Sequence, residues 1–213
     1  MNVTDFLKTN NMKKILEFIN NLNLNLTDGQ MNALSAYVDL VWDKKNSMNL
    51  TSVSSKEEIW GRHIADGLQF AKAVKDLGFE EGSFADIGSG AGYIGLAAAI
   101  ALPKTNAALI ESLEKRTIFL NWCVLKLDIK NVTILNERAG QAEPEQYDVV
   151  TERAMGKFDD ILPVCMEYVK DGGFFLPFQS EAGNAGRFKT INYTLPLEDK
   201  ERHIFVINKN GHN

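Results

Sequence analysis

Cysteine and histidine are scarce in this chain, and their scarcity narrows its chemistry. The 213 residues include two cysteines, Cys123 and Cys165, and three histidines. The cysteines form neither a C-x-x-C pair nor a zinc-like spacing, so the sequence predicts free, buried thiols in a reducing compartment. The chain also lacks an H-E-x-x-H motif, a serine elbow and a P-loop lysine. We therefore expect no metal site and no histidine-driven hydrolysis.

Long apolar runs and an excess of positive charge are absent as well. No segment approaches the ~18 consecutive apolar residues of a transmembrane helix, and the N-terminus lacks the apolar core of a signal peptide. We expect a cytoplasmic protein with no membrane partner. The formal net charge of −5 disfavours nucleic-acid binding through overall charge. Any contact with nucleic acid would have to come from a local basic patch.

The rest of the composition is ordinary for a globular protein, with 45% hydrophobic and 24% charged residues. From residue 84 onward, short apolar runs typical of strands alternate with helical patterns, which indicates an α/β fold. We expect a doubly wound, Rossmann-like, seven-stranded and mostly parallel sheet with right-handed crossovers. The expected strands are 84–87, 107–111, 132–135, 147–151 and 174–178, with weaker candidates for two edge strands at 191–195 and 203–207.

Helical patterns precede the sheet. Apolar residues recur at helical spacing over about 1–22, and Thr27-Asp-Gly-Gln30 matches a capping box that opens a second helix. Residues 46–53 form a polar connector, after which Ser54 or Ser55 caps a third helix. We therefore divide the chain into an N-terminal helical subdomain with its connector, 1–53, and a second domain, 54–213. Later helices are expected at 93–102, after a cap at Ser112, and at 158–169.

The third helix carries Arg62, His63 and Asp66 within five positions. Arg62 and Asp66 stand four residues apart, so a helix-surface ion pair is the simplest interpretation. The alternative is a working unit with Asn49 of the connector. In that case the connector and helix fold over the end of the first strand, and Asp66 orients Arg62 towards a substrate.

A glycine-rich stretch follows the first expected strand, Phe84-Ala-Asp-Ile-Gly-Ser-Gly-Ala-Gly-Tyr-Ile-Gly95. Gly88, Gly90 and Gly92 suit a turn with positive φ and a closely approaching ligand, and a helix begins at Tyr93. Asp86, at the carboxyl end of the strand, suits a cationic or hydroxyl-bearing ligand. However, Gly90-Ala-Gly92-Tyr-Ile-Gly95 also fits the dinucleotide pattern G-x-G-x-x-G, with Glu111 about 20 residues beyond it. This stretch alone leaves a methyl-donor site and a dinucleotide site open.

Polar residues also follow the next three expected strands, whose ends should meet at one cleft. Glu111 ends the second strand and can accept hydrogen bonds from both hydroxyls of a ribose. Arg138, Ala139 and Gly140 follow the third strand, where backbone groups can face an adenine. Arg153 follows the fourth strand, beside the expected reaction centre, although an arginine at that position is often only a surface charge.

Several stretches together resemble one family. Asp86-Ile-Gly-Ser-Gly-Ala-Gly92 resembles motif I of class I S-adenosylmethionine-dependent methyltransferases. The order and spacing of further stretches are similar to the small-subunit rRNA guanine-N7 methyltransferases called RsmG or GidB, from about residue 30 to 207. These stretches are Trp42-Asp-Lys44, Asn49-Leu-Thr-Ser-Val53, Arg62-His-Ile-Ala-Asp66, Glu111-Ser112, Lys115-Arg116, Phe119-Leu120, Arg138-Ala139, Arg153-Ala154 and Glu201-Arg-His-Ile-Phe-Val-Ile207.

The resemblance implies a methyltransferase domain at 54–213 that uses S-adenosylmethionine to methylate guanine N7 in the decoding-region loop of 16S rRNA. The implied partner is 16S rRNA or the small ribosomal subunit, and we expect a monomer. The implied cofactor contacts, together with those expected above, are Asp86, Gly88, Gly90, Gly92, Tyr93, Glu111, Ala139, Gly140 and Arg153. The residues implied to line the catalytic cleft are Asn49, Arg62, His63, Asp66 and Arg138.

The chain departs from this family at two informative positions. Gly140 stands where an acidic residue is usual, so a cofactor contact there can come only from the backbone. Phe178 stands where a lysine is usual, and its ring either continues the apolar strand or stacks on an unpaired base. Three alternatives for function stay open: a dinucleotide-dependent oxidoreductase, a catalytically weak RNA- or ribosome-binding protein, and a methyltransferase acting on a small molecule or protein.

Overall fold

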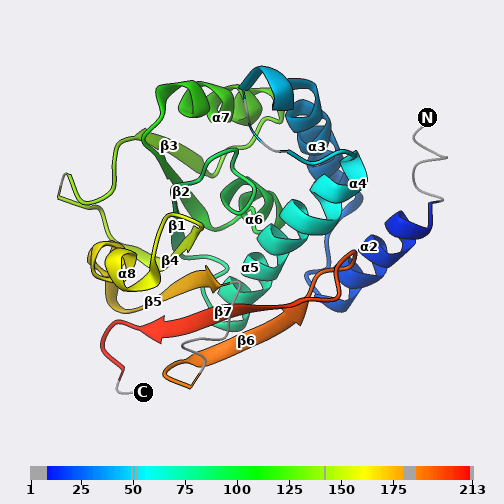
Figure 1. The fold of residues 1–213 in the computed structure, drawn as a ribbon. Helices are drawn as coiled ribbons and strands as arrows, with labels where there is room; N and C mark the ends of the chain where they lie inside the picture. Colours follow the sequence, from blue (N-terminus) through cyan, green and yellow to red (C-terminus); the bar gives the residue numbers. More distant parts are fainter. Residues whose placement is uncertain (1–8, 49, 51, 142, 180–185, 212–213) are drawn as a thin grey trace.

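The computed structural model describes residues 9–48, 50, 52–141, 143–179 and 186–211. The helices precede and alternate with the strands of one sheet (Figure 1). The helices are α2 (Asn10–Asn21), α3 (Asp28–Met48), α4 (Lys56–Glu58), the π-helix η1 (Ile59–Ile64), α5 (Ala65–Asp76), α6 (Gly95–Ala101), α7 (Glu114–Lys126) and α8 (Phe158–Glu167). The strands are β1 (Ser83–Ile87), β2 (Asn106–Glu111), β3 (Val132–Asn136), β4 (Tyr147–Arg153), β5 (Val169–Gln179), β6 (Lys189–Thr194) and β7 (Glu201–Asn208).

The strands form one seven-stranded sheet in the order β3-β2-β1-β4-β5-β7-β6. The pairs from β3 to β5 are parallel, whereas β7 runs antiparallel to both β5 and β6. This confirms the expected doubly wound, mostly parallel sheet. One detail was wrong: only the first of the two weaker candidates is an edge strand. The 203–207 segment lies inside the sheet between β5 and β6. Its five residues are all buried, with Ile204 and Val206 in the cluster on one face and Phe205 and Ile207 in the cluster on the other.

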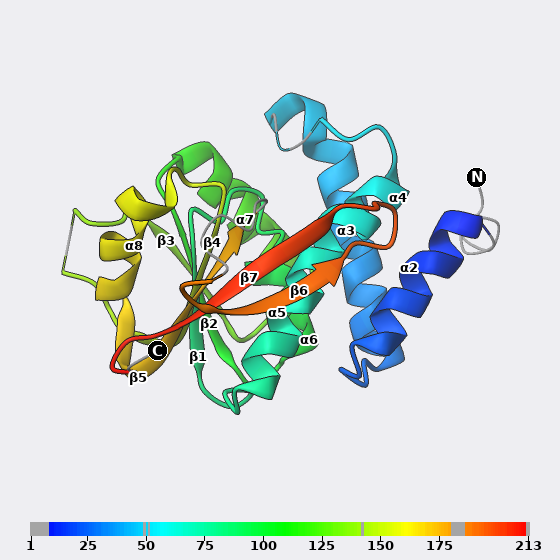
Figure 2. The ribbon, with the colours of Figure 1, turned by 60° about the horizontal axis from the view of Figure 1, so that its bottom comes forward.

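The two faces of the sheet carry separate hydrophobic clusters because alternate strand residues point to opposite sides. On one face, Phe84, Leu109 and Val149 pack with α5, α6 and α7, and α2 and α3 form a further layer outside them. On the other face, Ala85 and Val150 pack with α8. Figure 2 shows α8 on one side of the sheet and α5, α3 and α2 on the other.

The N-terminal helices attach directly to the layer that carries the glycine-rich stretch. The capping box is confirmed, since the Thr27 N–H donates to Gln30 Oε1 at 2.9 Å and the Gln30 N–H to Thr27 Oγ1 at 3.2 Å. From α3, the hydroxyl of Tyr37 donates to the Ala91 carbonyl at 2.7 Å. These helices share one hydrophobic cluster with the sheet, and the division at residue 53 stays a prediction.

The third helix differs from the continuous α-helix that the apolar spacing predicts. Ser55 caps it as expected, accepting from the Glu58 N–H at 3.1 Å. At Ile59 it widens into the π-helix η1, and it returns to α-helix at Ala65. The loop between β6 and β7 packs against this wide turn: a Cβ on Gly61 would lie 2.7 Å from Leu197 Cδ1. Most residues of 59–74 are buried, so apolar spacing marks no single face there and does not reveal the π-helical turn.

Candidate cofactor and active site

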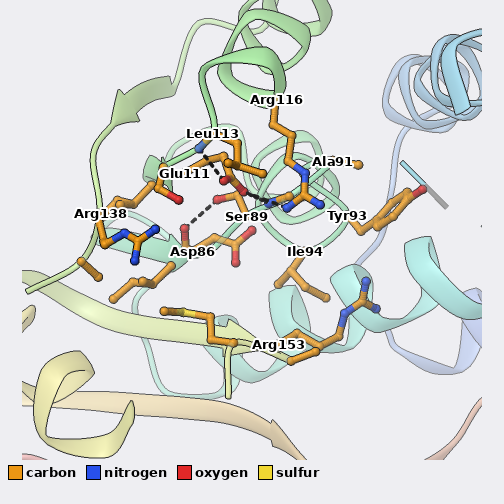
Figure 3. A pocket seen from close by; sticks show the side chains of 18 of the residues that line it. Asp86, Ser89, Ala91, Tyr93, Ile94, Glu111, Leu113, Arg116, Arg138 and Arg153 are labelled. Atoms are coloured by element: carbon orange, nitrogen blue, oxygen red, sulfur yellow. Dashed lines mark hydrogen bonds and ion pairs between the residues drawn. The ribbon is translucent and has the colours of Figure 1, made fainter. Parts of the chain in front are cut away.

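A cavity of about 740 Å³ opens at the carboxyl ends of β1, β2 and β4. This is the edge at which open α/β sheets bind ligands, and the volume is within the usual range for such pockets. Seen from close by, Arg138 and Arg153 lie on opposite sides of the cavity, with Asp86 and Glu111 between them (Figure 3). The expected convergence of loops from several strands is therefore present.

The glycine-rich turn forms the floor of the cavity. Gly88 and Gly92 have φ angles of +69° and +86°, values that side chains of L-residues rarely adopt. A Cβ on Gly88 would lie 2.7 Å from Met155 Cγ, and one on Gly92 would lie 2.7 Å from Leu120 Cδ2. The N–H groups of Gly88 and Ser89 donate to the Ile110 carbonyl at 2.8 and 3.1 Å. The glycines therefore allow the chain to turn back closely beside β2.

Asp86 stabilises this turn from below. Its Oδ2 accepts from the Gly95 N–H at 2.9 Å, and the Ser89 hydroxyl donates to its backbone carbonyl at 2.6 Å. The carboxyl is buried, and burial raises its pKa to about 7, although the Gly95 bond and the charge of Arg153 partly oppose this rise. Asp86 thus joins β1 to the start of α6 while lining the cavity.

Glu111 lines the cavity from the end of β2 and is held in place by backbone groups. Its Oε2 accepts from the Gly90 N–H at 2.9 Å, and its Oε1 accepts from the Leu113 N–H at 2.8 Å. Arg116 approaches Oε2 at 3.5 Å. The two oxygens of a carboxylate offer about four acceptor positions, so Glu111 keeps capacity for a hydroxyl-bearing ligand.

The helix cap expected at Ser112 is absent. The residue that precedes α7 is Leu113, which has no side-chain capping bond.

Two residues after β3 are placed differently from one another. Arg138 is exposed and lines the cavity together with Ala139. Gly140 has a φ of +81°, and its N–H donates to the Tyr168 hydroxyl at 3.3 Å. Gly140 is not part of the cavity lining, and neither is Gly92. A contact between this end of the cavity and an adenine stays a prediction.

At the opposite end, Arg153, His63 and Tyr93 form a compact group in the cavity wall. Arg153 Nη2 lies 3.3 Å from His63 Nδ1, and its guanidinium lies 5.7 Å from the centre of the Tyr93 ring. The rings of His63 and Tyr93 stack with centroids 4.0 Å apart. This group thus combines two stacked flat rings and a cation in the cavity wall.

The imidazole of His63 is neutral at physiological pH. Burial, together with the charges of Arg153, Arg62 and Arg202, lowers its pKa to about 3. Because a guanidinium can only donate, Nδ1 accepts from Arg153, and the ring proton is assigned to Nε2. His63 therefore carries its ring proton on Nε2 and has no positive charge.

The expected ion pair between Arg62 and Asp66 was wrong, and so was the expectation that Asp66 orients Arg62, whereas the working unit with Asn49 stays a prediction. Asp66 is buried and binds Arg153 Nη1 at 2.7 Å and Arg202 Nη1 at 3.3 Å through Oδ2, while its Oδ1 accepts from the Tyr193 hydroxyl at 2.6 Å. Arg62 Nε instead lies 2.7 Å from Glu198 Oε1. The wide turn of η1 directs Arg62 outward while Asp66 points into the protein. Neither residue lines the cavity directly.

Sequence reasoning missed several residues of this region. Tyr193, Glu198 and Arg202 come from β6, β7 and the loop between them, and only Arg202 lay in a stretch that resembles the family. Glu152 and Met155 were also missed: Met155 covers Gly88, and its N–H donates to the buried Glu152 at 3.1 Å. Asn49 lies outside the described residues.

Phe178 follows the simpler of its two interpretations. Its side chain is 7% exposed and packs in the same hydrophobic cluster as Leu176 and Ile204. In the sheet it is paired with Ile204 on β7 and with Arg153 on β4. The ring therefore continues the apolar core and does not line the cavity.

Comparison with known proteins shows the family to which the chain belongs. The family model described as "GidB: rRNA small subunit methyltransferase G" matches residues 30–190. The chain belongs to this family. It is 31% identical to the ribosomal RNA small subunit methyltransferase G of Acetivibrio thermocellus, over 92% of this chain and 88% of the relative. It is 33% identical to the enzyme of that name from Ligilactobacillus salivarius, over 87% and 86% of the two chains.

Solved structures agree on the fold. A ribosomal protein L11 methylase from Lactobacillus delbrueckii subsp. bulgaricus superimposes with a TM-score of 0.54 at 9% identity, covering 69% of this chain and 78% of that one. M. jannaschii TYW2, solved in complex with AdoMet, gives 0.51 at 16% identity, covering 67% and 74%. Because the chain belongs to a methyltransferase family, its glycine-rich turn is that of a methyltransferase. The alternative of a dinucleotide-dependent oxidoreductase is therefore excluded.

No helix among the described residues is long and apolar enough to cross a membrane. The same residues contain no group of three or more histidine, cysteine, aspartate or glutamate side chains arranged to hold a metal ion.

Proposed function

We propose that this GidB-family protein transfers a methyl group from S-adenosylmethionine to guanine N7 in the decoding-region loop of 16S rRNA. The observation that carries the proposal is the group formed by Arg153, His63 and Tyr93, which faces the same cavity as the glycine-rich turn and Glu111. A site for the methyl donor and a place for a flat base thus adjoin each other. We also propose that the protein is a monomer, that it works in the cytoplasm, and that its partner is 16S rRNA or the small ribosomal subunit.

The cavity suits S-adenosylmethionine. Glu111 is fixed by the N–H groups of Gly90 and Leu113, yet retains acceptor positions for the ribose hydroxyls. The close approach of the chain at Gly88 leaves no room for a side chain there. Asp86 places an acidic group beneath the turn, which favours a cationic ligand when it is ionised. Ala139 and Arg138 border the end we assign to the adenine.

The reaction asks little acid–base chemistry of the protein. S-adenosylmethionine supplies an electrophilic methyl group on a sulfonium. Guanine N7 has an in-plane lone pair and no proton, so it can take up the methyl group without deprotonation. No general base is needed, which agrees with a neutral His63 whose Nδ1 is already occupied by Arg153. The contribution of the chain is to hold the base in line, because alignment alone can account for much of such a rate enhancement.

Arg153 and Arg62 are the groups we propose for holding the RNA. Arginine commonly donates to guanine O6 and to phosphate. Arg153 is oriented by Asp66 and by His63, and its side chain is 23% exposed in the cavity wall. Arg62 is 46% exposed and lies outside the cavity, so it suits a flanking phosphate better than the base itself. The target guanine has to be unpaired or splayed out to be reached.

Mass spectrometry of 16S rRNA from a strain lacking this protein tests the proposal. We expect one guanine of the decoding-region loop to lose its N7 methyl group, and a plasmid copy of the gene to restore it. If every guanine keeps its modification state, the proposed substrate is wrong. Loss of methylation on ribosomal protein instead would favour the alternative of a protein methyltransferase.

A further inference from the structure

The loop between β6 and β7, residues 195–200, reaches across the sheet edge to the helix that carries Arg62. Leu197 of this loop packs on Gly61 so closely that a Cβ there would lie 2.7 Å from Leu197 Cδ1. The turn of the loop is closed by a bond from the Glu198 N–H to the Leu195 carbonyl at 3.1 Å. Two segments that are far apart in sequence thus meet at the wide turn of η1.

Glu198 is the charged part of this contact and binds two arginines at once. Its Oε1 lies 2.7 Å from Arg62 Nε, while its Oε2 accepts from Arg202 Nη2 at 2.8 Å and Arg202 Nε at 3.2 Å. Burial opposes ionisation of Glu198, but its bonds to Arg202 and the charge of Arg62 outweigh burial and lower its pKa. Glu198 is therefore a carboxylate at neutral pH, and both of its oxygens are in use.

The contacts continue inward from Glu198 to the cavity. Arg202 Nη1 reaches Asp66 Oδ2 at 3.3 Å, and Asp66 in turn holds Arg153 at 2.7 Å. Three guanidiniums are thus interleaved with two carboxylates between the exposed Arg62 and the cavity wall. The guanidiniums outnumber the carboxylates and the neutral His63 adds no charge, so the group has an excess of positive charge, which suits an anionic ligand such as an RNA phosphate.

The way in which Glu198 holds Arg62 leaves the outer end of Arg62 available. The anchor uses Nε, at the base of the guanidinium. Among the described residues, no hydrogen bond or ion pair is formed by Nη1 or Nη2 of Arg62. A guanidinium fixed through Nε presents its terminal N–H groups in one plane, which is the geometry for two parallel bonds to a phosphate.

We propose that Glu198 is a positioning residue that aims Arg62 at the RNA backbone next to the target guanine. This inference rests on the proposed function. It assigns to the β6–β7 loop a role in substrate recognition, although the loop does not line the cavity. Fixing a long side chain in advance lowers the entropy that would otherwise be lost when RNA binds.

The variant Glu198→Gln should change RNA binding in opposite directions, depending on whether Glu198 positions Arg62 or only contributes negative charge. Removing a negative charge beside two arginines should strengthen attraction to RNA if only net charge matters. A glutamine, however, has one acceptor oxygen, so it can keep Arg202 or Arg62 but not both. With Arg62 released, we expect KM for unmethylated small subunits to rise about tenfold, the effect of losing one hydrogen bond to a charged group, with kcat nearly unchanged.

Asp199→Asn is the matched control, because it removes the same charge from the adjacent, exposed position. We expect it to leave KM unchanged or slightly lower. In the double variant Arg62→Ala/Glu198→Gln, KM should be no higher than in Arg62→Ala alone, since Glu198 acts through Arg62. Binding of S-adenosylhomocysteine should be the same in all these variants. If Glu198→Gln lowers KM or matches Asp199→Asn, the inference is wrong.

An NMR measurement tests, independently of turnover, whether Glu198 fixes Arg62. The Nε–H signal of Arg62, assigned by its loss in Arg62→Ala, should exchange slowly in the wild-type protein and quickly in Glu198→Gln, while Asp199→Asn leaves it slow. A fast-exchanging Arg62 signal in the wild-type protein would overturn the inference. Failure of the wild-type protein to methylate small subunits would instead overturn the proposed function, and the NMR result would still stand.

Discussion

Arg153 and Asp66 lie 87 positions apart in the chain and form a 2.7 Å ion pair in which the aspartate is completely buried. The pair joins the end of β4 to the start of α5. Asp66 also accepts bonds from Arg202 and Tyr193, so one carboxylate connects the cavity wall to β6 and β7. A buried charge with this many partners is costly to leave incomplete.

We therefore expect Asp66→Asn to be strongly destabilising. The amide cannot balance two guanidiniums, and the free energy of unfolding should fall by about 3 kcal/mol, as when one partner of a buried ion pair is removed. The control is Asp76→Asn on the same helix, which breaks only a surface pair with Lys72 and should cost less than ~1 kcal/mol. Urea unfolding of both variants gives the comparison, and equal losses would contradict a central role for Asp66.

Arg62→Ala should separate activity from stability. Its side chain is 46% exposed, and its ion-pair partner among the described residues is the partly exposed Glu198, so its removal should change the free energy of unfolding by less than ~1 kcal/mol. Methyl transfer to small subunits should fall at least tenfold in kcat/KM, by the loss of a charged contact to RNA. Calorimetry with S-adenosylhomocysteine should show unchanged affinity. A parallel loss of melting temperature and activity would mean that Arg62 has only a structural role.

Phe178 should behave as a core residue. Because its ring is buried in the same hydrophobic cluster as Ile204 of β7, Phe178→Ala should lower the free energy of unfolding by about 3–5 kcal/mol. Phe178→Leu, which keeps most of the apolar volume, should cost clearly less. The salt dependence of RNA binding should be the same in wild type and Phe178→Leu. A changed slope with unchanged stability would place the ring on the RNA.

Stability should depend on pH through Glu152. Burial raises the pKa of this carboxyl to about 7 from an ordinary value near 4.5, with the Met155 N–H opposing and the charge of Asp86 adding to the rise. Between these two pH values the folded protein retains a proton that the unfolded chain releases, so this carboxyl destabilises the fold increasingly as pH rises through the window. Glu152→Gln does not titrate and can still accept from Met155.

The melting-temperature difference between Glu152→Gln and wild type should accordingly favour the variant more at pH 8 than at pH 5. The shift of the pKa corresponds to a gain in the free energy of unfolding of the variant, relative to wild type, on the order of 3 kcal/mol at most. The exposed Glu145→Gln variant serves as the control and should show no such trend. A pH-independent difference for Glu152→Gln would contradict the account of this buried carboxyl.

The sequence predicts the fold well, and also the part of the site formed by the glycine-rich turn and the strand ends, because both are encoded locally. Alternating strand and helix patterns define the sheet, and the glycines of the turn adopt the positive φ angles expected of them. Glu111 and Arg153 face the cavity because the ends of parallel strands meet at one edge. These inferences need only periodicity and the topology of a doubly wound sheet.

The part of the site around Arg62, Asp66 and the β6–β7 hairpin depends on long-range contacts, which local sequence patterns do not contain. Spacing favoured Arg62 with Asp66, but the π-helical turn separates them and the β6–β7 hairpin supplies each with a different partner. Nothing in the spacing of Tyr193 or Glu198 marks them as neighbours of a helix more than 120 residues earlier. Their part in the site follows from how β7 inserts between β5 and β6.

The central claim is that this chain methylates guanine N7 of 16S rRNA, and reconstitution tests it most directly. The purified protein would be incubated with small subunits from the deletion strain and S-adenosylmethionine carrying a deuterated methyl group. The rRNA would then be digested and its nucleosides and fragments analysed by mass spectrometry. We predict deuterated N7-methylguanosine at one position of the decoding-region loop, and none with Arg153→Ala. Label in another nucleoside, in protein, or in no product at all would contradict the account.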